Sequence, residues 1–360
     1  MTTADIDHPS ETFDRLGRKI DPTDSSVAAR YVLNDIYCSA WLSHAISALC
    51  EHRVPDFVGG EPTAIESIAK KAGLHAPTLY RALRALAANG IFEERGDGFF
   101  LHNDVSRLLC ADHPYSWSGM ARMWGHPSCM SAWMHYRKSL TDGQSGIKHA
   151  FGKTLYEHLA QDPATTKAFS DAMISNSAHA AVSISREFPF RNFKRVLDLG
   201  GGAGTLLHTI LAENEHLEGV IFDLPELESL AKDSIRTADL ASRCQFIAGN
   251  FLSEVPSGAD LYLIKNSLWN WSDDHCIEIL RNIRRAIGTT YGARFLLIEY
   301  VINSRNKKWT TAYDLQILNM PGGRARTEAE YKMLLLQAGL AVTETDIIED
   351  QTLMLSAPVQ

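Results

Sequence analysis

A glycine-rich segment beside an acidic residue is the part of this sequence best suited to hold a ligand. Gly200, Gly202 and Gly204 lie between a short apolar run and a helical pattern, and Asp198 comes just before them. Glycine lets a backbone turn sharply and approach a bound molecule closely, because no Cβ stands in the way. A dinucleotide fingerprint spaces its glycines G-x-G-x-x-G, whereas the spacing here is G-x-G-x-G. The segment therefore predicts a nucleoside ligand without a pyrophosphate.

Four residues after later apolar runs extend this predicted site. Asp223 ends the second run, where a carboxylate can accept hydrogen bonds from both ribose hydroxyls. Asn250 and Phe251 follow the third run and suit the edge and the face of an adenine, and Lys265 ends the fourth. Taken singly, Asp223 could instead cap a helix before Pro225, and Phe251 could be a core residue. Together they favour ligand binding.

Alternating strands and helices must position these residues. Apolar runs predict strands at 195–199, 219–222, 245–247, 260–264 and 295–298, and helical patterns predict helices at 205–212, 226–238, 274–287 and 328–336. This alternation predicts a doubly wound, mostly parallel α/β sheet, whose ligand binds at the carboxyl ends of the strands. Residues 341–348 and 351–356 predict a closing antiparallel pair.

The first third of the chain predicts a mainly α domain. A long apolar helix is predicted at 26–50. It is followed by a helix that opens at Thr63, another helix at 76–88 and a hairpin at 91–101, and these last three elements together predict a winged helix. The helix that would read DNA offers only Arg81 and Arg84 beside two glutamates, so we favour pairing with a second copy of the chain. Residues 120–159 and 164–188 predict further helices.

Composition narrows the class of partner. The formal net charge of -8 gives no basic field for nucleic acid or anionic lipid. The six cysteines form no C-x-x-C pair, and histidines and acids do not gather at ligand spacing, so we expect no metal. The acidic start does not suit a signal peptide, and no run approaches the ~18 apolar residues of a membrane span. We expect a cytoplasmic protein.

Six motifs carry a resemblance to a known family, at 198–204, 222–225, 249–251, 264–265, 270–273 and 321–324. The chain resembles the plant and bacterial O-methyltransferases, which use S-adenosylmethionine (SAM) and release S-adenosylhomocysteine (SAH). The resemblance implies a flexible N-terminus at 1–20, a winged-helix dimerisation domain at 21–115, a helical, substrate-lining segment at 116–190 and a class I SAM-binding domain at 191–360. It also implies a homodimer and a small aromatic substrate.

The resemblance implies particular cofactor contacts. Gly200 would lie against the methionine part of SAM, Asp223 would hold the ribose, and Asn250 would meet adenine, although the family usually has Asp there. The full implied cofactor set is Asp198, Gly200, Gly202, Gly204, Asp223, Leu224, Asn250, Phe251, Lys265 and Ser177.

The catalytic pattern of the family is broken in this chain. Where the family has Lys-x-x-x-His-Asp-Trp, Trp269 replaces the histidine base and Asn270 replaces the acid. An indole N–H only donates, so Trp269 cannot accept a proton. Of the two carboxylates that flank the histidine, Glu299 matches the first, and Ala325 stands in place of the second. Glu299, Trp269 and Asn270 are the catalytic candidates; Glu299 could steer a nitrogen, act as a base or cap a loop.

Three explanations fit the absence of the histidine base. General base catalysis typically raises the reaction rate by about 10²- to 10⁴-fold. The acceptor could be a nitrogen, carbon or acidic hydroxyl of an aromatic or heteroaromatic specialised metabolite, which we favour. His126, His135 or His275 could replace the base. SAM could instead bind without donating its methyl group, in a decarboxylation, hydroxylation or pericyclic step. A SAM-sensing DNA-binding regulator is a remote fourth reading.

The substrate side is less clearly marked. An aromatic, mostly apolar pocket for a flat ligand would draw on Trp124, Phe169, Met173 and Trp269, with Asp314 and Asn319 orienting the acceptor. Asp314 opposite a cationic nitrogen would suit N-methylation. Phe169 could equally be a core residue.

Overall fold

The structure is a computed structural model that describes residues 25–359. The predicted flexible segment 1–20 lies outside the described residues. Contacts divide the chain into two compact units, with the boundary after Asn103. The finer predicted boundaries at residues 115 and 190 stay predictions.

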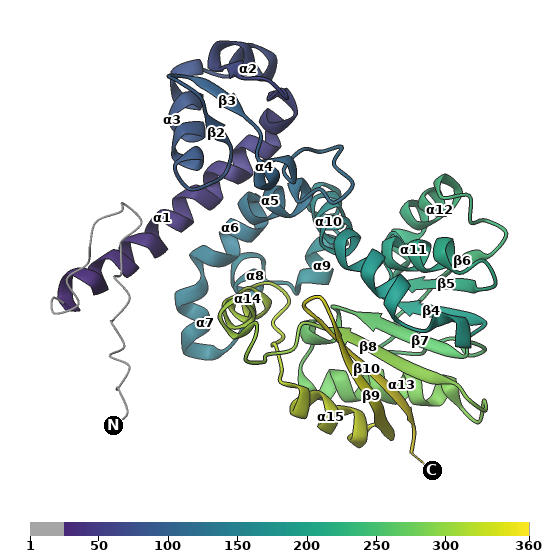
Figure 1. Ribbon diagram of the computed structural model, residues 1–360. Helices are drawn as coiled ribbons and strands as arrows, with labels where there is room; N and C mark the ends of the chain where they lie inside the picture. The colour runs from purple at the N-terminus through teal and green to yellow at the C-terminus, as the bar shows by residue number, and fades with distance from the viewer. Residues whose placement is uncertain (1–24, 360) are drawn as a thin grey trace, which may run out of the picture. The chain divides into compact units, whose positions relative to one another are not determined.

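The first unit contains the predicted winged helix (Figure 1). Its elements are α1 (Ser25–Glu51), η1 (Val54–Phe57), β1 (Thr63–Ala64), α2 (Ile65–Ala72), α3 (Ala76–Ala87), β2 (Glu93–Glu94) and β3 (Phe99–Leu101). The helix expected to open at Thr63 instead begins at Ile65, because Thr63 and Ala64 pair with β3 as a third strand. Ile68, Leu83 and Phe100 are fully buried and form its core.

A series of helices opens the second unit. They are α4 (Asp104–Arg107), α5 (Ser118–Gly125), α6 (Pro127–Met134), α7 (Tyr136–Asp142), α8 (Gly146–Phe151), α9 (Leu155–Leu159) and α10 (Pro163–Glu187). The helical stretch predicted at 120–159 is thus broken, because Pro127 starts a new helix and Gly143 and Gly152 end two others in the left-handed conformation. Asp162 caps α10 through the amides of Ala164 and Thr165.

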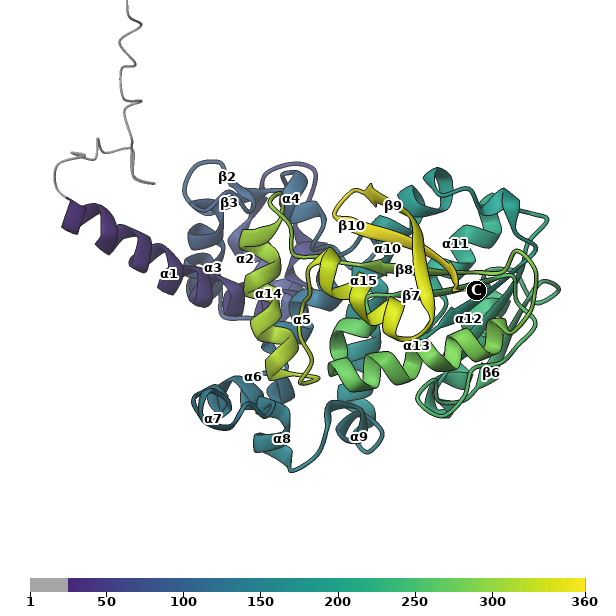
Figure 2. The same cartoon turned by 90° about the horizontal axis from the view of Figure 1, so that it is seen from below.

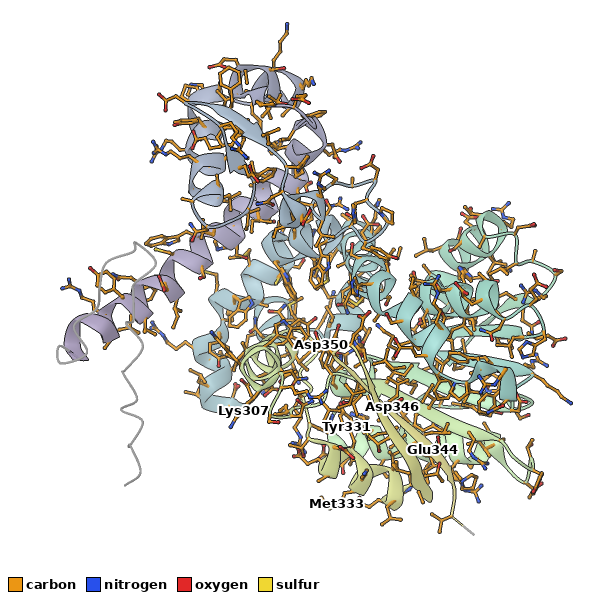
Figure 3. All side chains as sticks on the ribbon, viewed as in Figure 1. Lys307, Tyr331, Met333, Glu344, Asp346 and Asp350 are labelled. Atoms are coloured by element: carbon orange, nitrogen blue, oxygen red, sulfur yellow. The ribbon has the colours of Figure 1, made fainter. Side chains whose placement is uncertain are left out.

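The sheet of the second unit has the order β6-β5-β4-β7-β8-β10-β9. β4 (Arg195–Leu199), β5 (Glu218–Asp223), β6 (Cys244–Ala248), β7 (Leu261–Lys265) and β8 (Arg294–Glu299) are parallel, and β9 (Leu340–Ile348) and β10 (Gln351–Pro358) join antiparallel. Strand order reverses beside β4, so the switch point lies between β4 and β7. β9 is an edge strand whose exposed Glu344 and Asp346 oppose pairing with another chain (Figure 3).

Helices cover both faces of this sheet, as predicted (Figure 2). One core packs α10, α11 (Thr205–Glu213) and α12 (Glu228–Thr237) on the sheet, and the other packs α13 (Asp273–Ile287) and α15 (Glu328–Gln337). On α15, Tyr331 is fully buried whereas Met333 is exposed (Figure 3). Helix α14 (Lys307–Asn319) was not predicted.

Candidate active site

One pocket lies at the carboxyl ends of β4 to β7, beside α9 and α10. It brings together twelve of the predicted site residues: Phe169, Met173, Ser177, Asp198, Gly200, Gly202, Asp223, Leu224, Asn250, Phe251, Lys265 and Asn270. Six others stand outside its wall: Gly204, Trp124, Trp269, Glu299, Asp314 and Asn319. The cofactor residues therefore converge, and most of the predicted catalytic and substrate residues do not line the same space.

The glycine segment turns from β4 into α11 along one side of the pocket. Gly200, Gly202 and Gly204 have φ of 73°, 58° and 82°, in the left-handed region that favours glycine. A Cβ on Gly204 would lie 2.5 Å from Ile221 Cδ1, so this glycine is needed for packing under the turn. A Cβ on Gly202 would meet nothing within 4 Å, and a Cβ on Gly200 would come within 3.5 Å of Ser267 Oγ.

Asp223 ties the end of β5 to this turn. Its Oδ2 accepts a hydrogen bond from the Gly202 amide at 2.8 Å, and its Oδ1 accepts one from Leu224 at 2.7 Å. Burial raises the pKa of the carboxyl, and the two backbone bonds oppose that rise. The carboxylate thus supports the turn and borders the pocket, where its remaining lone pairs can accept ribose hydroxyls.

Asp198, which is buried, and Lys265, which is half-buried, both line the pocket. Burial raises the pKa of Asp198 to about 7, and the nearby charge of Asp223 acts in the same direction. Burial lowers the pKa of Lys265 to about 8, while the carboxylates of Glu299 and Asp198 oppose that change. Lys265 Nζ reaches Ser177 Oγ on α10 at 3.5 Å, which links β7 to the helix.

An aromatic wall closes another side of the pocket. Trp271 stacks on Tyr156 with ring centroids 5.2 Å apart and an interplanar angle of 8°, and it meets the edge of Phe251 at 5.8 Å. Asn270 Nδ2 donates to the Tyr156 hydroxyl at 3.1 Å, and Asn250 Oδ1 accepts from the Leu252 amide at 2.9 Å. Tyr156 was not among the predicted site residues, because nothing in the helical stretch around it marks a ligand site.

Trp269 lies in a separate aromatic stack. Its ring lies 5.0 Å from Tyr313 and 5.5 Å from Tyr300, and Trp309 continues the stack at 5.1 Å from Tyr313. Trp124 meets the edge of Tyr313. Trp269 is only 3% exposed, and its Nε1 donates to the Asn266 carbonyl at 2.9 Å. Tyr313 offers no base in this stack, because burial raises its pKa well above the usual range.

Glu299 is fully buried behind the loop that follows β7. Its Oε1 accepts hydrogen bonds from the amides of Ser267 at 3.1 Å and Trp269 at 3.3 Å, and its Oε2 has no hydrogen-bond partner among residues 25–359. Burial raises its pKa to about 8. Of the roles considered for Glu299, the loop cap is the one this geometry supports. To contact an acceptor in the pocket, Glu299 would have to line the pocket wall, and it does not.

The side chains of Asp314 and Asn319 are hydrogen-bonded to backbone groups. Asp314 Oδ1 accepts from the Ala325 amide at 2.6 Å. Asn319 is fully buried, and its carboxamide donates to the Ala132 carbonyl and accepts from the Trp133 amide, both at 3.2 Å. These bonds hold the loop after α14 and the end of α6.

The three histidines considered as substitute bases lie outside the pocket wall. Nδ1 of His126 caps α6 at Ser128, that of His135 bonds to the Ser131 carbonyl, and that of His275 bonds to Ser272 Oγ. No histidine lines the pocket within residues 25–359. The described residues also contain no group of three or more His, Cys, Asp or Glu side chains placed to hold a metal ion.

Comparison with known proteins decides the family. Models of an O-methyltransferase domain and an O-methyltransferase dimerisation domain match residues 133–341 and 34–112. The chain belongs to the O-methyltransferase family. The winged-helix unit thus corresponds to the family's dimerisation domain. Among the described residues, no helix is long and apolar enough to span a membrane.

Individual relatives extend this match over most of the chain. The mitomycin biosynthesis 6-O-methyltransferase of Streptomyces lavendulae is 32% identical over 89% of this chain and 91% of its own. The 8-amino-8-demethylriboflavin N,N-dimethyltransferase of Streptomyces davaonensis is 27% identical, over 84% and 87%. The solved mitomycin 7-O-methyltransferase MmcR superimposes with a TM-score of 0.84 at 31% identity, over 94% and 100%. This family member is a SAM-dependent methyltransferase.

Proposed function

We propose that this enzyme methylates a nitrogen, carbon or acidic hydroxyl of a small aromatic or heteroaromatic specialised metabolite, as a cytoplasmic homodimer. One observation carries the proposal. No histidine lines the pocket in the described part of the chain, and Trp269, where the resemblance implies the family's base, is a donor-only side chain. An acceptor that must lose a proton early would find no histidine base there.

The pocket residues fit SAM. Gly200 and Gly202 expose backbone at the pocket wall, and Asp223 presents a carboxylate beside them. Asn250 and Phe251 offer an amide and a ring for adenine, and their amide and stacking contacts need no metal ion. When bound, SAM supplies a methyl group on a cationic sulfur. The protein's contribution is to align the acceptor with that methyl group for in-line displacement.

A nitrogen acceptor suits this chemistry well. Its lone pair forms the new N–C bond while the C–S bond breaks, and the bonding pair stays on sulfur to leave neutral SAH. A proton on that nitrogen passes to water after the transfer. An ordinary phenol is disfavoured, because lack of a general base costs typically about 10²- to 10⁴-fold in rate. The similarity to an N,N-dimethyltransferase supports the proposal.

Transfer of label from methyl-labelled SAM to matched acceptors tests this function. We expect methylation of amino-heteroaromatics and of electron-rich carbons, and turnover of simple phenols at least about 100-fold lower. A second protein, Trp269→His, should gain phenol methylation if the site is an altered family site.

Two outcomes would contradict the proposal. Substrate turnover that needs SAM but transfers no label would identify a non-methylating enzyme of the decarboxylase, hydroxylase or pericyclase type. Salt-sensitive retention of DNA, with no turnover, would identify a SAM-sensing regulator.

A further inference from the structure

The carboxamide of Asn266 is a buried polar group that the contacts within the protein leave unused. Asn266 directly follows Lys265, the last residue of β7, and it lines the pocket. Both its Nδ2 and its Oδ1 are buried and have no hydrogen-bond partner within the described chain. Buried amides are nearly always paired, because an unpaired one loses its water without compensation. Because both atoms are closed off, a turn of the Asn266 side chain toward the pocket is the step that would let a ligand satisfy this amide.

The backbone of Asn266 is fixed on both sides. Its φ is 50°, in the left-handed region that asparagine tolerates better than most residues. Its amide donates to the Ile298 carbonyl at 2.9 Å, and its carbonyl accepts from Trp269 Nε1 at 2.9 Å. Trp269 is itself held by Glu299 through its backbone amide. Trp269 and Glu299 thus act as positioning residues, which hold the Asn266 carboxamide at the pocket.

The neighbours of Asn266 locate it in the pocket. Lys265, before it, reaches Ser177 on α10, and Ser267, after it, lies against the turn at Gly200. Asn266 therefore lies between the helix and the glycine turn. The apolar side chains Phe169 and Met173 of α10 line the same pocket. Four amides line the pocket, those of Asn176, Asn250, Asn266 and Asn270, and Asn266 is the one whose two polar atoms are both buried without a partner in the described chain. Such an amide can fix the orientation of a flat ligand.

We propose that Asn266 is the specificity-determining residue for the acceptor, and that it selects a planar heteroaromatic with an amino group beside a ring nitrogen. A carboxamide matches that edge in two bonds, since its oxygen accepts an N–H and its NH₂ donates to the ring nitrogen, as Asn does with adenine. The carboxamide oxygen orients the amino group of the acceptor. The lone pair of the amino nitrogen forms the N–C bond while the C–S bond of SAM breaks. The second N–H proton passes to water. This inference rests on the proposed methyl transfer and narrows its acceptor.

The test compares two ligands of the same size in the SAH-loaded protein. 2-Aminoquinoxaline carries the amino group beside a ring nitrogen, and 2-methylquinoxaline replaces it with a methyl group. Isothermal titration calorimetry should give the amino compound at least about tenfold tighter binding, as expected for a bidentate amide pair. Asn266→Gly keeps the left-handed backbone. This variant should bind the two compounds with about equal affinity, while its Kd for SAH changes less than threefold. Asp239→Gly, an exposed left-handed residue outside the pocket, is the matched control and should keep the preference.

Three results would overturn the inference. They are equal binding of the two quinoxalines to the unmodified protein, a preference that persists in Asn266→Gly, and a tenfold or greater loss of SAH affinity in that variant. The last would assign the amide to the cofactor. Failure of the proposed function looks different, because the amino compound would still bind selectively while no label passed from SAM to any acceptor.

Discussion

Trp269 Nε1 donates a hydrogen bond to the backbone carbonyl of Asn266 across 2.9 Å. Trp269, which the resemblance aligns with the family's base, therefore has a structural use, since it closes the loop after β7. The amides of Ser267 and Trp269 also donate to Glu299, so the indole and the buried carboxyl hold the same loop. This arrangement predicts how the loop responds to substitution.

Trp269→Phe keeps a ring in the stack and removes only the indole N–H. The Asn266 carbonyl loses its partner, which should lower the free energy of unfolding by about 1 to 2 kcal/mol. Acceptor kcat/KM should fall about tenfold as the loop loosens, with the SAM Kd changed less than threefold. Urea unfolding, calorimetry and initial rates measure the three quantities. Trp309→Phe, at the outer end of the stack, is the matched control, and equal effects of both variants would contradict a role for the Trp269 bond.

Glu299→Gln tests whether the buried carboxyl acts as a base. Burial raises its pKa from 4.5 to about 8, so at pH 7 it is mostly protonated, and glutamine keeps its acceptor oxygen. Activity at pH 7 should stay within about threefold, since removal of a true base costs about 10²-fold or more. Glu299→Ala, which leaves two amides unpaired, should lower the unfolding free energy by about 2 to 4 kcal/mol.

Glu299→Gln also tests how the free energy of unfolding depends on pH. Because the folded pKa of Glu299 lies above the unfolded value, the folded protein holds a proton that the unfolded chain has lost between about pH 4.5 and 8. The wild type therefore loses stability from this group as pH rises through that window, and Glu299→Gln does not. Urea midpoints should favour the variant more at pH 8 than at pH 5. The opposite trend would show that the carboxylate is stabilised by its surroundings.

Most of the second unit's fold could be predicted from sequence, because its strands are continuous apolar runs and helical patterns lie between them. Two of these helices, α13 and α15, also begin at the side-chain caps Ser272 and Thr327. Helix α14 could not, because its threonines and aromatic residues show no single apolar stripe. Its Trp309 and Tyr313 stack on each other and on Tyr300 and Trp269, which lie outside the helix. The helices between α5 and α9 are broken at Pro127, Gly143 and Gly152, which the helical periodicity hides.

That most of the predicted cofactor residues line one pocket could also be foreseen, because they lie at or just after the carboxyl ends of neighbouring parallel strands. The acceptor half depends on tertiary packing. A motif places Glu299 near the loop but cannot tell that its carboxyl faces backbone amides rather than the pocket. No sequence motif singles out Asn266. It stands out only in the three-dimensional structure, by its left-handed backbone and its unpaired amide.

The pocket carboxyls predict that SAM binding depends on pH. Burial and the charge of Asp223 raise the pKa of Asp198 to about 7, so below pH 7 its carboxyl is mostly protonated. SAM is a cation at sulfur, and a nearby carboxylate attracts it. The SAM Kd should therefore rise as pH falls from 7.5 to 6, and calorimetric titrations should show proton release on binding near pH 7. Asp198→Asn should bind SAM more weakly with a smaller pH dependence, whereas a pH-independent Kd in the wild type would contradict this account.

Helix α1 predicts the surface that forms the dimer. Five of its apolar side chains are between 54% and 69% exposed in the single chain: Val32, Leu33, Ile36, Tyr37 and Trp41. Full burial of a large apolar side chain typically stabilises by about 1.5 to 3 kcal/mol, so placing two charges there should weaken association by at least about 100-fold. We expect Ile36→Asp/Trp41→Asp to sediment as a monomer at concentrations where the wild type and Lys70→Glu, an exposed site on α2, sediment as dimers. Unchanged circular dichroism would show that the variant is folded, and a dimeric double variant would move the interface to another surface.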